Sequence, residues 1–189
     1  MHSSIRSEIE SIVPLDLIEE EHRADALAWV DSGAQLFRLE KPALPPKHLV
    51  SYFAVVDPCG MLLVEHISAG RWLPTGGHVE VGEHPRETVA RELFEELGFA
   101  PKGEVGPPLL ITCTETVGVS ARHTDVSLWY VVSADRSQIL KYDKSDFNSV
   151  RWFDFAEIPF AQSDPHMGRF VEKLARRVEK STHSRAGSN

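Results

Sequence analysis

The first part of the chain has apolar residues at helical spacing. They predict two helices, over residues 3–13 and 15–32. An aspartate followed three residues later by a glutamate is typical of a helix start, and this pair begins at Asp16. Three prolines within residues 42–46 then predict a linker. We therefore expect residues 1–45 to form an N-terminal helical extension and linker.

After the linker, the pattern changes to that of β-strands alternating with helices. Stretches rich in β-branched and aromatic residues predict strands over residues 48–56, 61–66, 109–117, 124–132 and 149–153. Apolar residues at helical spacing predict helices over residues 84–97 and 164–179. The apolar face expected for the first of these helices comprises Val89, Ala90, Leu93, Phe94 and Leu97.

This order of elements predicts the fold class. Two helices, two strands, a helix, three strands and a closing helix favour a single α+β domain over a doubly wound sheet. We expect the domain to span residues 46–180 and residues 181–189 to form a disordered tail. A polar loop is expected over residues 118–123, between two of the strands.

Three glutamates share one face of the predicted helix over residues 84–97. Glu92, Glu95 and Glu96 are three and four positions apart, which brings their side chains together on a helix. Like charges at this spacing repel one another, and a divalent cation bound between them reverses that effect. A plain solvated helix face is the alternative. The glycine-rich turn before the helix, and Arg91 as the one basic neighbour of the cluster, favour a metal site.

Composition and charge restrict the function classes. The 189 residues carry a net charge of −8 and a pI of about 5.6, which argues against binding DNA or RNA polymers through Lys and Arg. Cys59 and Cys113 are too few and too far apart for a disulfide framework or a zinc site, so we expect free thiols. Neither a signal-peptide core nor an apolar run of membrane-spanning length stands out, which predicts a cytoplasmic protein without membrane contact.

The glutamate-rich segment resembles the Nudix box, G-x5-E-x7-R-E-U-x-E-E-x-G-U, in which U is a bulky apolar residue. A pattern with nine fixed positions is far more specific than a lone glycine motif. An aliphatic residue is commoner at its last position, but every fixed position is filled at the required spacing. The residues are Gly77, Glu83, Arg91, Glu92, Leu93, Glu95, Glu96, Gly98 and Phe99.

The resemblance implies a fold and a reaction. The fold is a Nudix-type α/β/α sandwich with a mixed central sheet, here with an N-terminal helical extension. The reaction is hydrolysis of a phosphoanhydride bond in a nucleoside diphosphate linked to another moiety, with Mg²⁺ or Mn²⁺ as the cofactor. A nucleoside triphosphate or a related nucleotide is the substrate we expect.

The resemblance also implies roles for the residues of the box. Glu92, Glu95 and Glu96 are the implied catalytic residues and metal ligands, and the carbonyl of Gly77 is an implied further ligand. Glu92 is the implied proton acceptor or orienter of the attacking water. The ion pair implied to support the site joins Glu83 and Arg91.

Several polar residues near the box are weaker candidates. Those that could contact substrate or an extra metal are Glu80, His78, Glu115, Asp125 and Arg71. For other residues, a place in the core or a solvated side chain without a specific role is favoured over a functional role. They are His66, Trp72, His84, Arg122, His123, Trp129 and Tyr130.

Two expectations about function and assembly remain open. The alternative to an enzyme is a catalytically silent nucleotide-sensing or scaffold module that keeps the Nudix fold, and the complete box favours the enzyme. Because Nudix domains often dimerise, the resemblance also predicts a homodimer.

Overall fold

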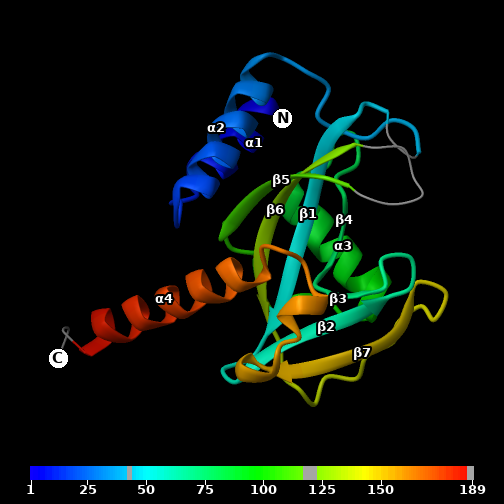
Figure 1. Ribbon diagram of the computed structural model, residues 1–189, viewed down its shortest axis with the longest axis vertical. Helices are drawn as coiled ribbons and strands as arrows, with labels where there is room; N and C mark the ends of the chain where they lie inside the picture. Colours follow the sequence, from blue (N-terminus) through cyan, green and yellow to red (C-terminus); the bar gives the residue numbers. More distant parts are fainter. Residues whose placement is uncertain (42–43, 117–122, 187–189) are drawn as a thin grey trace.

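The computed structural model describes residues 1–41, 44–116 and 123–186, with a mixed sheet between helices (Figure 1). It begins with helices α1 (His2–Glu10) and α2 (Leu17–Asp31). Helix α2 begins as predicted, because the Asp16 carboxylate accepts a hydrogen bond from the Glu19 N–H at 3.0 Å. Ile18 of this helix is 50% exposed and so does not belong to its buried face.

Seven strands form one sheet, which is mixed as expected. The parallel pair β1 and β6 lies at its centre, with Lys47 opposite Thr124 and Val56 opposite Ser133. The other pairs are antiparallel: β2 and β4 on β1, β5 on β6, and β3 and β7 on β2. The strands are β1 (Lys47–Val56), β2 (Gly60–His66), β3 (Arg71–Leu73), β4 (Thr75–His78), β5 (Leu110–Glu115), β6 (Thr124–Ser133) and β7 (Phe147–Asp154).

Strands β3 and β4 were not expected from the sequence. Pro74 separates them, and two of the four residues of β4 are glycines, a composition that predicts a turn. Tertiary pairing overrides that preference, since β4 pairs with β1 and places Gly77 opposite Ser51. A side chain at Gly76 would clash, because its Cβ would lie 2.6 Å from the Ser51 carbonyl oxygen.

Alternate residues of the sheet pack into two separate hydrophobic cores. Phe53, Leu62 and Leu128 belong to one, which also holds the buried side chains of α1, α2 and the box helix α3 (Pro85–Leu97). Ala54, Leu63 and Trp129 belong to the other, with α4 (Met167–Ala186). Period-two alternation therefore gives the three layers of an α/β/α sandwich. Short 3-10 turns, Phe155–Glu157 and Phe160–Gln162, lead into α4.

The two later helices differ from their predicted form in two places. Phe94, expected on the apolar face of α3, is 64% exposed, because Val89, Leu93 and Leu97 already complete the stripe that faces the sheet. Helix α4 continues to Ala186, so residues 181–186 are helical where a disordered tail was expected. The last three residues and most of the loop predicted over 118–123 lie outside the described residues.

The N-terminal helices are bound to the rest of the chain by charge pairs as well as by the core. Glu8 of α1 pairs with Arg86 at the start of α3. Glu19 of α2 is fully buried and pairs with Lys173 of α4. These pairs join the helices to both outer layers. Within the described chain, no helix is long and apolar enough to cross a membrane.

Candidate functional site

The box helix begins and ends at well-defined signals. The His84 side chain accepts from the Arg86 N–H at 3.3 Å, and the Glu87 carboxylate accepts from the His84 N–H at 2.8 Å. These two bonds form a capping box, with Pro85 at the first helical position. Gly98 ends the helix at φ 77°, a conformation that favours glycine. His84 is thus a helix cap, and not the merely solvated residue that was expected from the sequence.

Arg91 holds the strand-to-helix connection in place. Its guanidinium donates to both Glu83 oxygens, at 2.9 and 3.0 Å, and to the His78 carbonyl at 3.2 Å. Burial alone would raise the pKa of Glu83, but the hydrogen bonds from Arg91 and Thr88 outweigh it and lower that pKa. The expected ion pair is therefore present and fixes the loop before α3 against β4.

Glu92 lies against the backbone of β4. A Cβ added to Gly77 would be 1.9 Å from Glu92 Oε1, so glycine is needed for this close approach. The same oxygen accepts from Arg91 Nη1 at 2.6 Å. Burial raises the pKa of Glu92 in spite of that contact. The carboxylate and the Gly77 backbone thus lie where one ligand could contact both.

Glu96 is the most perturbed carboxylate of the three. Burial, followed by the charge of Glu92, raises its pKa to about 8. Its Oε2 accepts from the Gly76 N–H at 3.2 Å, an uncharged donor. A carboxylate in this setting is short of positive charge, which a cation could supply.

Glu95 completes the set on the solvent side. Its side chain is 58% exposed, and one oxygen lies 3.3 Å from Arg91 Nη1. Oxygen donors of this kind, two partly buried and one exposed beside a glycine backbone, suit a hard divalent cation such as Mg²⁺ or Mn²⁺. Arg91 competes with such a cation for the oxygens of Glu92 and Glu95.

Among the described residues, Glu80, Glu115 and Arg71 make no hydrogen bond to these three glutamates. Glu115 is exposed at the end of β5, and Glu80 is exposed beyond β4. Arg71 donates to the Ser163 carbonyl at 3.0 Å. Trp129 and Tyr130 are fully buried core residues, which excludes stacking on a base. Arg122 lies outside the described residues.

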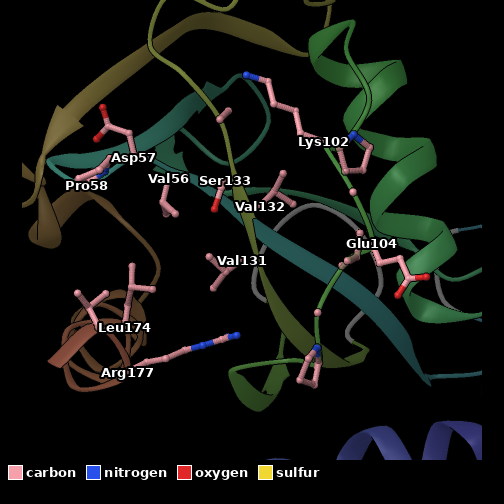
Figure 2. Close-up of a pocket in the computed structure, with 17 residues that line it drawn as sticks. Val56, Asp57, Pro58, Lys102, Glu104, Val131, Val132, Ser133, Leu174 and Arg177 are labelled. Carbon is pink, nitrogen blue, oxygen red and sulfur yellow. The ribbon is translucent and has the colours of Figure 1, made fainter. Parts of the chain in front are cut away.

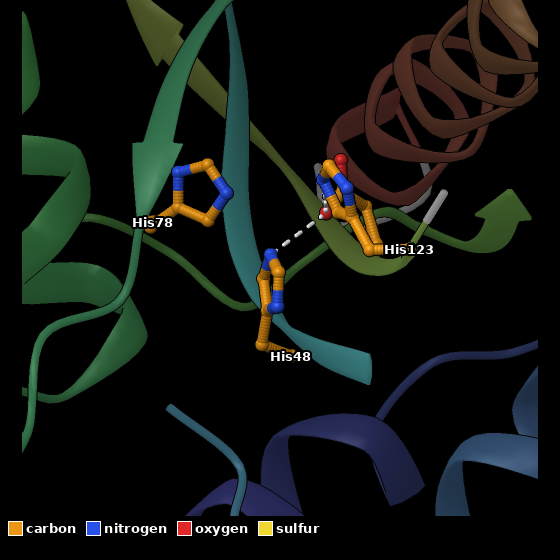
Figure 3. Close-up of side chains that lie close together, drawn as sticks. His48, His78 and His123 are labelled. Carbon is orange, nitrogen blue, oxygen red and sulfur yellow. Dashed lines mark ion pairs between the residues drawn. The ribbon is translucent and has the colours of Figure 1, made fainter. Parts of the chain in front are cut away.

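A second group of polar side chains lies on the neighbouring strands (Figure 3). It comprises His48, His78, His123 and Asp125, whose nearest ligand atoms are all within 4.8 Å of one another. The sequence singled out three of these residues but not His48, which is hidden in a hydrophobic strand pattern. Burial, helped by the charge of Arg38, lowers the pKa of His78 to about 4.

A groove of about 740 Å³ opens elsewhere, between the loop over residues 101–107, the end of β6 and α4 (Figure 2). Val131 and Leu174 give it apolar walls, and Lys102 and Arg177 lie at its edges. It is lined by none of the residues that the sequence nominated for the site. We therefore place the candidate active site at the glutamates and not in this groove.

Comparison with known families decides which one this is. The model of the NUDIX domain matches residues 47–174. The chain belongs to the NUDIX family. As a NUDIX protein it resembles the MutT protein from Methanosarcina mazei Go1, with a TM-score of 0.58 and 19% identity over 70% of this chain and 95% of that one. A NUDIX-family hydrolase from Clostridium perfringens gives a TM-score of 0.53 and 20% identity over 68% and 96%. Both likenesses show the fold.

The relatives found by sequence match a smaller part of this chain than the structures do. Proteins named "Putative 8-oxo-dGTP diphosphatase 2" in two strains of Mycobacterium tuberculosis (CDC 1551 / Oshkosh and ATCC 25618 / H37Rv) are 37% identical over 73 residues. The alignment covers 34% of this NUDIX chain and 52% of the relative. The chain therefore spans about half the length of the curated relatives it matches. The NUDIX match begins at β1, so α1 and α2 lie outside it while contributing to the same core.

Proposed function

We propose that this NUDIX protein hydrolyses a phosphoanhydride bond in a nucleoside triphosphate or a related nucleotide, with Mg²⁺ or Mn²⁺ as cofactor. The observation that carries the proposal is the pair of partly buried carboxylates, Glu92 and Glu96, packed against the backbone of Gly76 and Gly77. A charge pattern of this kind is unfavourable without a cation and is suited to a ligand that brings one.

The residues that would hold the cation are the three glutamates of the box and the carbonyl of Gly77. The raised pKa values of Glu92 and Glu96 support this assignment, because cation binding favours the ionised form that burial disfavours. When bound, the cation neutralises the pyrophosphate and lowers the pKa of water.

The protein's own groups would orient the reaction. Glu92 is the proposed acceptor of the water's proton, since a partly buried carboxylate with a raised pKa is a stronger base at neutral pH. Arg91 and Glu83 are positioning residues, which hold the His78 carbonyl and so the path of β4 beside α3. The close Gly77–Glu92 approach would keep the carboxylate aligned with the nucleotide's phosphates.

The substrate is proposed at the level of a class. The relatives from Mycobacterium tuberculosis are named for 8-oxo-dGTP, which makes that nucleotide the first member of a test panel. The panel also contains the ordinary nucleoside triphosphates, nucleotide sugars and dinucleotides. Trp72 is half-buried and packs edge-on against Phe153, so its ring is less free to stack on a base than the sequence allowed.

The test measures metal-dependent release of phosphate or pyrophosphate from each nucleotide. We expect turnover with Mg²⁺ or Mn²⁺ that EDTA abolishes, and a loss of at least about 100-fold in Glu96→Gln. Glu21→Gln, on the exposed surface of α2, is the matched control and should retain full activity. Tight nucleotide binding by calorimetry without turnover of any nucleotide would instead favour a sensing or scaffold module.

A further inference from the structure

We propose that His48, His123 and Asp125 form a second metal site, for a transition-metal dication such as Zn²⁺, with His78 as its fourth ligand. The site adjoins the glutamates of the box, since His78 follows Gly77 in β4, and differs from them in donor chemistry. Imidazole nitrogens suit Zn²⁺ and its neighbours, whereas carboxylates and carbonyls suit Mg²⁺.

Strand pairing brings the four residues together from distant parts of the sequence. His48 of β1 lies directly opposite Asp125 of β6 in the parallel register, and His78 of β4 lies opposite Val50. His123 comes just before β6, and its ring stacks on that of His48 at 4.9 Å. The rings of His48 and His78 are 4.8 Å apart. The site is therefore built on paired strands, which hold ligands more rigidly than loops do.

His48 is oriented as a metal ligand would be. The ring is fully buried, and its Nδ1 is 2.9 Å from the Pro45 carbonyl, a group that can only accept a hydrogen bond. Nδ1 therefore carries the proton, and in the neutral ring the lone pair is on Nε2. A backbone carbonyl bound to the other ring nitrogen is the usual support of a ligating histidine.

That nitrogen lies beside a carboxylate oxygen. His48 Nε2 is 3.2 Å from Asp125 Oδ1, the pair joined by a dashed line in Figure 3, and neither buried atom has a well-aligned hydrogen bond among the described residues. With the ring neutral, both atoms are acceptors and repel each other, so this contact requires a proton or another cation. A cation between them would satisfy both.

His123 is arranged in the same way. The Thr116 hydroxyl donates to the His123 carbonyl at 3.2 Å, so it accepts from His123 Nδ1 at 3.0 Å. The lone pair of this ring is again on Nε2, which is 3.4 Å from Asp125 Oδ1. The Nε2 atoms of two imidazole rings thus lie within 3.4 Å of one carboxylate oxygen.

Arg38 controls the fourth position. Its Nη1 donates to His78 Nε2 at 3.1 Å, which occupies the single lone pair of that neutral ring. For His78 to bind the metal, the Arg38 guanidinium must move away from His78 Nε2. The positive charge of Arg38 also repels a dication at this site. Arg38 is therefore a competitor of the metal, and Arg38→Ala should bind it more tightly.

The experiment uses the full-length protein, stripped with a chelator, and titrates it with Co²⁺ as a spectroscopic substitute for Zn²⁺. We expect the strong visible d–d bands of a four- or five-coordinate site with nitrogen ligands, unchanged by millimolar Mg²⁺ and by Glu96→Gln. His48→Gln and Asp125→Asn should lose the bands and weaken Zn²⁺ binding by at least about 100-fold, measured by competition with a chromophoric chelator.

His66→Gln is the matched control, because His66 lies on β2 outside the cluster and contacts Ser68 at 3.1 Å. It should bind like the native protein, and circular dichroism of each variant without metal shows whether it is folded. Asp125→Asn keeps the shape of the side chain, so it tests the charge even where His48→Gln unfolds. Bands that persist in folded Asp125→Asn, or that Mg²⁺ removes, would overturn the second site. Unchanged affinity in Arg38→Ala would refute the role given to His78.

Discussion

Replacing Glu96 by glutamine is expected to stabilise the metal-free protein while removing its activity. Glu96 has a pKa of about 8, raised from 4.5 first by burial and then by the charge of Glu92. Between these two pH values the folded chain holds a proton that the unfolded chain has released. Stability therefore falls as pH rises through this window. Glutamine keeps the shape, and its carbonyl can still accept from the Gly76 N–H.

The magnitude follows from the same numbers. The ordinary pKa of 4.5 and a working pH of 7.5 differ by about three pH units. Each unit changes the free energy of unfolding by about 1.4 kcal/mol. The carboxylate thus costs about 4 kcal/mol at pH 7.5 and almost nothing at pH 4.5. For a protein of this size, about 4 kcal/mol raises the melting temperature by roughly 10 °C.

The assay is thermal unfolding of the native protein and Glu96→Gln in EDTA, at pH 5 and pH 7.5, repeated with saturating Mg²⁺. We expect the variant to be the more stable one at pH 7.5 in EDTA and nearly equal at pH 5. Mg²⁺ should raise the melting temperature of the native protein and have little effect on the variant. Glu21→Gln should match the native protein throughout. A variant less stable than the native protein at pH 7.5 in EDTA, or equally stabilised by Mg²⁺, would refute the reasoning.

Three further substitutions test other contacts. Gly77→Ala would put a methyl group 1.9 Å from the oxygen of Glu92 that Arg91 also binds. We expect kcat/KM to fall about 100-fold with little change in melting temperature, and unchanged kinetics would contradict the close approach. Glu83→Gln weakens the ion pair with Arg91, so it should lower the free energy of unfolding by about 1–3 kcal/mol and also lower the activity. Thermal unfolding and kinetics of the same sample measure the two effects. Lys173→Met leaves the carboxylate of Glu19 buried without its cation and should cost about 3–5 kcal/mol in urea unfolding, much of which the double variant with Glu19→Gln should recover.

The box helix is the part of the molecule that could be predicted best from the sequence. The spacing of its apolar residues and of its glutamates is local, and local geometry is what sequence patterns report. Even there, exposure depends on neighbours, and Phe94 is exposed although it has helical spacing with the core residues. The family match and the mixed sheet confirm the fold that the resemblance implied.

The parts that could not be predicted depend on pairing between distant segments. Strand β4 contains two glycines and forms because β1 offers it an antiparallel partner. His48 looks like one polar residue in a buried strand, and its meeting with Asp125 is set by the parallel register of β1 and β6. A shift of that register by one residue would turn the two side chains to opposite faces. The pattern of a single strand does not say which distant strand it will pair with.

The parallel pairing of β1 with β6 has a consequence for how the protein is made. The first of these strands is synthesised long before the second, and α1 and α2 share a core with both. During translation the apolar N-terminal segments therefore cannot be fully covered until residues 124–133 emerge. We expect the nascent chain to need chaperone protection over that interval, and folding on the ribosome to complete late and as a single cooperative step.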